Sequence, residues 1–165
     1  MRYVTAILLS LALADPVALA AEGSTSPSAQ ALLGLIAKEG GRKVLWNLWE
    51  RDKEFDRVIS GIESGDPSWL KVATALKPFS DGAASLSLDY AVARALPKAP
   101  NQVLALVGHG FSAADICTSP FIEPDPGVAE AYERQALAAL SKVKAPALAP
   151  IAAECSKQVR LPDGA

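Results

Sequence analysis

One histidine and two cysteines are the side chains of this 165-residue chain best suited to nucleophilic or metal-binding chemistry. His109 stands between two glycines in the stretch VGHGFSAADIC, which ends at Cys117, and the second cysteine is Cys155. An imidazole beside a thiol can generate the thiolate of a cysteine nucleophile. The same two cysteines can instead form a disulfide, which leaves no thiolate for that chemistry. Whether the cysteines form a disulfide or stay available as a nucleophile depends on the compartment of the protein.

The N-terminal residues indicate export. A positive charge at Arg2 precedes an apolar run from Val4 to Ala14, which is followed by a proline and by small residues near position 20. This order is typical of a secretory signal peptide, so we expect residues 1–20 to be removed and residues 21–26 to form a flexible leader. The apolar run is too short to cross a bilayer, and no later segment is suited to span one. We therefore expect a periplasmic or secreted protein without a membrane span after cleavage.

Export predicts that Cys117 and Cys155 are joined. A small, even number of cysteines, far apart in an exported chain, is typical of a disulfide. Because the bond would close a loop of about 38 residues, the chain-entropy estimate gives a stabilisation of about 3 to 4 kcal/mol. The bond would also exclude a Cys117–His109 dyad. We interpret His109 as a partly exposed residue at a helix end, near the last helical carbonyls.

Other residues with catalytic potential have a structural interpretation. Ser68 and Lys71 match the S-x-x-K motif, in which the amine activates a hydroxyl one helical turn away, but the companion K-T-G is absent. Glu123 and Asp125 resemble the paired carboxylates of a glycosidase. They lie in a proline-rich loop, where Asp125 is expected to cap a helix. One histidine and two cysteines at this spacing do not form a standard zinc site. We therefore predict no catalytic residue, no metal site and no cofactor.

The spacing of apolar residues between turns marked by proline or glycine predicts an all-α fold. Hydrophobic residues make up 50% of the sequence and aromatic residues only 6%, and no run alternates apolar and polar residues over the length of a strand. Apolar residues recur at helical spacing between turns marked by proline or glycine. We expect one domain over residues 27–160, with about six to seven short helices in a bundle or a small helical solenoid, one disulfide, and a frayed tail at 161–165. The expected helices cover 27–40, 43–65, 66–78, 80–96, 125–144 and a last segment from 147, with short helical turns between 100 and 117.

Charge and aromatic residues limit the possible partners. The formal net charge is −2 and no basic cluster is present, so no nucleic-acid partner is expected. Trp46 and Trp49 are spaced three apart in a predicted helix, for which core anchoring is the favoured interpretation and a sugar-stacking platform the alternative. The residues retained as a candidate interaction surface are Trp46, Trp49, Trp69, His109 and Glu123.

One segment of the chain carries a family resemblance. Residues 64–104, about a quarter of the sequence, contain the pattern GDP-S-W-L, L-x-P, D-x-x-x-S-x-x-L and A-L-P in that order. In this pattern the segment resembles uncharacterised small exported helical proteins of Gram-negative bacteria. The resemblance implies a periplasmic helical fold. It implies no activity and transfers no site residue.

We expect a non-enzymatic protein that binds a protein partner. A concrete version is an inhibitor or immunity protein that acts against a hydrolase of the cell envelope. The first alternative is a cell-wall or carbohydrate-acting enzyme or ligand carrier, with the tryptophans for stacking and the Glu123/Asp125 loop for acid chemistry. The second alternative is a structural component of the envelope. The identity of the partner and the oligomeric state are left open by the sequence.

Overall fold

The computed structural model describes residues 27–160, and within this range the regular secondary structure is helical, with no β-strand. The all-α prediction is confirmed. The predicted signal peptide (1–20), leader (21–26) and frayed tail (161–165) lie outside the described residues. Along this range run nine α-helices and one 3-10 helix: α1 (Ala29–Glu39), α2 (Gly41–Trp49), α3 (Asp52–Glu63), α4 (Pro67–Leu76), η1 (Lys77–Phe79), α5 (Gly82–Ala95), α6 (Pro100–Leu104), α7 (Ala113–Ile116), α8 (Val128–Leu140) and α9 (Ala149–Gln158).

The helix count exceeds the predicted six to seven, in part because the helix expected over 43–65 is two helices. α2 ends at Trp49 and α3 begins at Asp52. In one continuous helix, Arg51 would share the buried stripe that joins Leu48 to Phe55, and burial of an unpaired charge is costly. The break leaves Arg51 exposed, where its guanidinium donates to the Asn47 carbonyl and pairs with a carboxylate of α3.

Side-chain caps fix the starts of two helices. The carboxylate of Asp66 accepts hydrogen bonds from the backbone N–H groups of Ser68 and Trp69 at the start of α4. Ser112 and Asp115 form a reciprocal capping box at the start of α7. Such bonds satisfy N–H groups that have no partner inside the helix.

The start of α8 differs from the prediction. Asp125 does not cap the helix: the N-cap is Gly127, whose φ of 87° is left-handed. The carbonyl of Asp125 accepts from the N–H of Val128 and so closes a turn before the helix. Glycine adopts this backbone conformation without the steric cost that a side chain would bring. α8 also ends at Leu140, earlier than the expected position 144.

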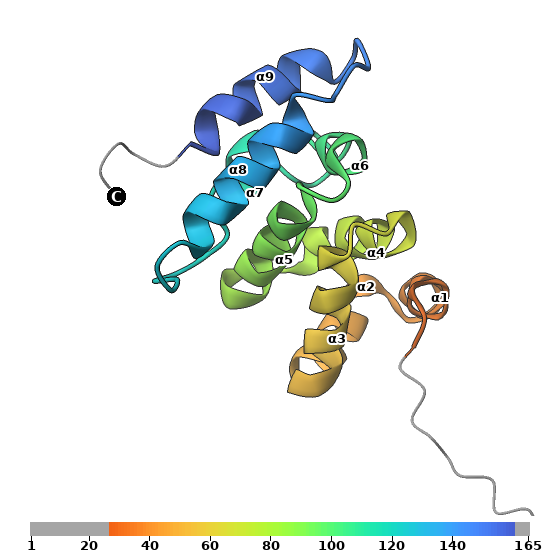
Figure 1. The fold of residues 1–165 in the computed structure, drawn as a ribbon. Helices are drawn as coiled ribbons and strands as arrows, with labels where there is room; N and C mark the ends of the chain where they lie inside the picture. Colours follow the sequence, from red (N-terminus) through yellow and green to blue (C-terminus); the bar gives the residue numbers. More distant parts are fainter. Residues whose placement is uncertain (1–26, 161–165) are drawn as a thin grey trace, which may run out of the picture.

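α5 lies at the centre of the fold, between the group α1–α4 and the group α6–α9 (Figure 1). It packs against α3 and α4 of the first group and against α6 and α7 of the second. Its inward side chains are fully buried and alternate between small and branched residues, which lets neighbouring helices approach closely. The residues of α5 and its C-cap that belong to the hydrophobic core cluster are Leu88, Ala91, Val92, Ala95 and Leu96. No helix within residues 27–160 has the length and apolar character that a membrane span requires.

The disulfide Cys117–Cys155 is confirmed. It joins the residue that follows α7 to the middle of α9, and both cysteines are fully buried. α9 also packs against α8, so the bond ties this C-terminal helix pair to the short helix α7. The pairing removes both thiols from nucleophilic chemistry, as the sequence predicted.

Candidate interaction surface

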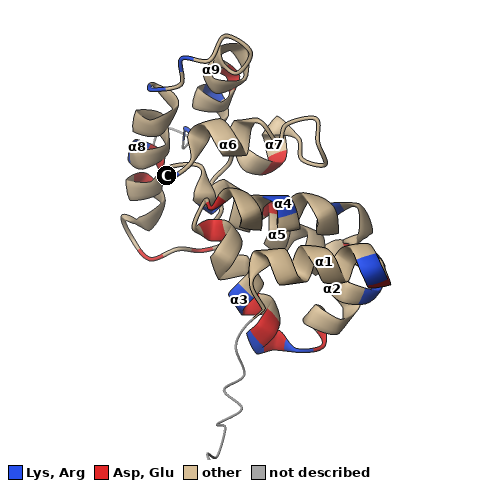
Figure 2. Ribbon diagram, turned by 90° about the vertical axis from the view of Figure 1, so that its right-hand side faces the viewer, with Lys and Arg blue, Asp and Glu red and all other residues tan. Residues whose placement is uncertain are grey.

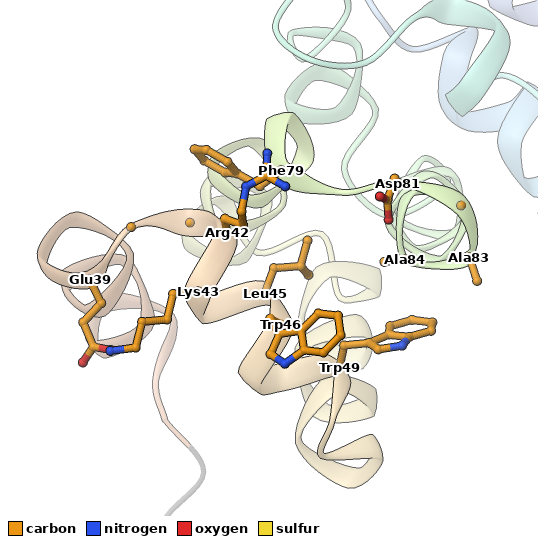
Figure 3. A pocket seen from close by; sticks show the side chains of 13 residues that line it. Glu39, Arg42, Lys43, Leu45, Trp46, Trp49, Phe79, Asp81, Ala83 and Ala84 are labelled. Atoms are coloured by element: carbon orange, nitrogen blue, oxygen red, sulfur yellow. The ribbon is translucent and has the colours of Figure 1, made fainter.

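A groove lined by three exposed aromatic side chains lies on the surface of the described residues. Trp46 and Trp49 come from α2 and Phe79 from η1. The groove has a volume of about 720 Å³, and we call it the aromatic groove. Figure 3 shows Phe79 and Arg42 at one end, the two indoles at the other and Leu45 between them, with the start of α5 opposite α2.

The amphipathic pattern of α2 turns the two tryptophans outward. Val44, Leu45 and Leu48 fill the face of α2 that packs into the core. Trp46 and Trp49 share the opposite side, where Trp46 is 65% exposed and Trp49 is 37% exposed. The expectation of core anchoring is therefore wrong for Trp46. Trp46 follows Arg42 by four positions and Lys43 by three, which places it on the polar side of α2 and was a local signal of its exposure.

Phe79 reaches the groove because α2 begins with a glycine. Its ring lies on the first turn of α2, so close that a Cβ added to Gly41 would lie 2.3 Å from a ring carbon. The ring is nevertheless 40% exposed on its other side. Gly41 is thus the residue that allows an aromatic ring to close this end of the groove.

Charged residues of both signs border the aromatic groove. Glu39 and Lys43 form an ion pair of 2.9 Å at the edge of α2. Arg42 lies beside Phe79, and Asp81 lies across from it, at the N-cap of α5 (Figure 3). Within residues 27–160, neither Arg42 nor Asp81 forms an ion pair. An apolar centre with a charged border is the usual composition of a protein-binding patch.

A second hollow of about 510 Å³ continues the surface between α3 and α5. Trp49 lines both hollows, and its indole packs edge-on against Phe55, with ring centroids 5.1 Å apart. The far side of the second hollow is formed by Tyr90 and Arg94 of α5. Trp49 therefore separates two neighbouring depressions on one face.

Arg94 connects the second hollow to the loop 118–127. Its guanidinium bonds to Glu63 Oε1 and to the Pro120 carbonyl, both at 2.8 Å, and lies 5.4 Å from the centre of the Phe121 ring. Phe121 in turn packs edge-on against Tyr132 of α8. Trp49 thus links the aromatic groove to the second hollow, and Arg94 links the second hollow to the loop.

The predicted site residues do not all lie on this surface. Trp69 is half-buried and packs on Gly61, where an added Cβ would be 2.5 Å from its ring. His109 is exposed in the turn between α6 and α7, where its N–H donates to the Leu106 carbonyl, in keeping with its predicted place at a helix end. Glu123 lies in the loop 118–127. Only Trp46 and Trp49 line the groove.

Sequence reasoning missed Phe79 and Arg94. Phe79 lies in the turn sequence Lys-Pro-Phe-Ser-Asp, and Arg94 reaches the second hollow only in the folded chain. A single aromatic residue after a helix-ending proline was the one available signal for Phe79. The partners of Arg94, at sequence distances of 31 and 26 residues, have no local signal.

A buried ion pair behind the groove serves the fold. Lys77 Nζ of η1 donates to Asp89 of α5 and to Ser85 Oγ, and lies over the ring of Phe111. Burial raises the pKa of the Asp89 carboxyl, against the opposing effect of Lys77. Among the described residues, every buried side-chain polar atom has a hydrogen-bond partner, and no cluster of residues is suited to hold a metal ion.

Comparisons with known proteins give no relative for this chain. No family model matches it, and no curated protein or solved structure matches it either. The resemblance of residues 64–104 to small exported helical proteins therefore stays a prediction.

Proposed function

We propose that this protein acts after export by binding a protein partner through the aromatic groove, as an inhibitor or immunity protein of an envelope hydrolase would. The observation that carries the proposal is the exposure of Trp46 beside Trp49 and Phe79. Exposed aromatic residues gathered on one patch mark interaction surfaces more often than chance. Tryptophan and arginine, both present here, are enriched among residues that dominate binding energies.

The shape of the groove favours a macromolecular partner over a small ligand. A small-molecule site commonly encloses most of its ligand. Here Trp46 projects from α2 with 65% of its surface exposed, which suits insertion into a complementary pocket of a partner. Arg42 and Asp81 at the border can pair with charges of the partner and fix its orientation.

The carbohydrate alternative is supported by the neighbouring indoles of Trp46 and Trp49 (Figure 3). The acid residues once considered with them, Glu123 and Asp125, do not line the groove. Stacking and acid chemistry would therefore require two separate places on the surface. A saccharide-binding role without catalysis is the form of this alternative that the geometry supports.

Quantitative affinity capture tests the proposal. The wild-type chain and the variants Trp46→Ala, Phe79→Ala and Leu35→Ala are immobilised and exposed to envelope extract of the native cell, and the recovered proteins are compared by mass spectrometry. Leu35 is a matched control because it is an exposed apolar residue of α1 outside the groove. We expect one stoichiometric partner on the wild-type and Leu35→Ala chains, with recovery reduced about tenfold or more on the two groove variants.

Two results would contradict the proposal. The first is equal recovery of every protein by all four chains. The second is an absence of any stoichiometric partner across a range of salt concentrations. Titration with muropeptides or chitooligosaccharides then examines the alternative: quenching of tryptophan emission that disappears in Trp46→Ala would replace the protein partner by a saccharide.

A further inference from the structure

The loop 118–127 differs from the other connections of the fold in composition and exposure. Its sequence, TSPFIEPDPG, contains three prolines, which restrict the backbone even before binding. It carries two carboxylates and no lysine or arginine. Figure 2 shows the acidic residues of this segment projecting at the edge of the molecule, before α8.

The base of the loop is held firmly by the core. Arg94 binds the Pro120 carbonyl, and the Phe121 ring packs between the Arg94 guanidinium and Tyr132. Tyr132 is itself buried and donates its hydroxyl to the Ala93 carbonyl. The loop starts directly after the disulfide-bonded Cys117. The N-terminal part of the loop is therefore attached to α5 and α8.

The tip of the loop is exposed and conformationally strained. Ile122 is 70% exposed, the highest value among the large hydrophobic residues that the structure describes. The next residue, Glu123, has a φ of 47°, and it is the one residue other than glycine in the left-handed region within 27–160. A side chain in this region is unfavourable unless the surrounding structure imposes it, and such positions gather at binding sites.

We propose that the loop 118–127 is an insertion element, whose Ile122 enters an apolar, aliphatic-sized pocket of the protein partner. The border of that pocket would be basic, because Glu123 and Asp125 flank the isoleucine and no cation of the loop balances them. This inference rests on the proposed function, since it concerns the same partner. Arg94, which binds the Pro120 carbonyl, lines the second hollow together with Trp49, and Trp49 also lines the aromatic groove.

Preorganisation explains why a fixed loop suits this role. A flexible loop loses conformational freedom when it binds, whereas a loop already held in shape loses little. The prolines and the Arg94 contact hold this loop in its exposed form before any partner is present. An anionic membrane surface is not a suitable occupant, because it would repel the two carboxylates.

Site-specific photo-crosslinking with competition tests the inference. A short aliphatic diazirine amino acid, close to isoleucine in size, replaces Ile122 in the purified chain, which is irradiated in envelope extract of the native cell, and adducts are identified by mass spectrometry. Four unlabelled chains serve as competitors: the wild type, Ile122→Val, Ile122→Asp, and the double variant Glu123→Lys, Asp125→Lys. The same probe at Leu86, another exposed apolar residue, is the positional control.

We expect one predominant adduct at position 122 that is absent from position 86. The concentration of competitor that halves the adduct should agree within about twofold for the wild-type and Ile122→Val chains. It should be at least about tenfold higher for the Ile122→Asp and double lysine variants. Equal competition by Ile122→Asp, an equal adduct at position 86, or no adduct at all would overturn the inference.

A Trp46→Ala competitor separates this inference from the proposed function. If only the groove binding is wrong, this variant competes as well as the wild-type chain while Ile122→Asp does not. If only the loop insertion is wrong, capture still depends on Trp46 and is unchanged by Ile122→Asp. Because Ile122 is exposed, its substitution leaves the core intact, and circular dichroism of each chain checks this.

Discussion

Arg94 and Pro120 lie 26 residues apart in the sequence and are joined by a hydrogen bond of 2.8 Å from Nη2 to the carbonyl oxygen. The other terminal nitrogen of the same guanidinium bonds to Glu63. One side chain of α5 thus binds α3 and the loop 118–127 at once. The planar fork of arginine makes this possible, because it presents several donors in a fixed arrangement.

Replacement of Arg94 by lysine should loosen the loop without unfolding the protein. Lysine keeps the charge but has no fork, so it cannot serve both Glu63 and Pro120 in the same geometry. We expect faster hydrogen exchange for the amides of 118–123 and unchanged exchange in α9. Glu63→Gln is the control, because it weakens the ion pair but leaves the bond to Pro120. Equal loosening in both variants would contradict a specific role of the Pro120 bond.

Removal of the disulfide should lower stability by about 4 kcal/mol on the chain-entropy estimate for its sequence separation of 38. The comparison uses the oxidised wild-type chain and the double variant Cys117→Ala, Cys155→Ala in urea unfolding. Alanine suits both positions because both are fully buried. A difference below about 1 kcal/mol would show that the unfolded chain is already constrained by other contacts.

The pH dependence of stability should carry a contribution from Asp89. Because burial raises its pKa in the folded state above 3.8, the folded protein retains this proton more readily than the unfolded chain. The stabilising contribution is therefore complete below pH 3.8 and is lost as the pH rises through the folded pKa. We expect the stability of the wild-type chain, relative to Asp89→Asn, to decrease over this interval.

Urea unfolding of the two chains between about pH 3 and pH 7 measures this difference. Asp115 is present in both, so its contribution largely cancels. Burial opposes its ionisation, but hydrogen bonds from Ser112 lower its pKa, which places its own titration below 3.8. A relative stability that increases with pH would show that the attraction of Lys77 outweighs the burial of Asp89.

Local signals in the sequence predicted local features of the fold. The helix predicted to begin at position 66 does so, and the caps at Asp66 and Ser112 depend only on backbone groups two or three residues away. Cys117 and Cys155 pair because no other cysteine competes with them. Asp125 is a residue type that often caps helices, but it does not cap α8. The N-cap is Gly127, whose left-handed backbone turns the chain into the helix.

The candidate site depended on information that a linear pattern does not contain. Trp46 is a partial exception, since it shares the polar side of α2 with Arg42 and Lys43, and this helical pattern agrees with its exposure. The contact of Arg94 with Pro120, by contrast, exists only after α5 has packed against α7 and the loop that follows it. The sequence could nominate Trp46 and Trp49, but it could not place Phe79 beside them.

The contact between Gly41 and Phe79 predicts that Gly41→Ala changes the free energy of unfolding in opposite directions in the wild-type chain and in a Phe79→Ala chain. Gly41→Ala should destabilise the wild-type chain by about 1 to 3 kcal/mol, because the new Cβ overlaps the ring. In a Phe79→Ala chain that overlap is gone, and the same change should stabilise α2 by up to about 1 kcal/mol, since alanine favours helix over glycine. Urea unfolding of the four chains measures both effects. If Gly41→Ala changes the free energy of unfolding in the same direction in both chains, the Phe79 ring is not the reason for the glycine at position 41.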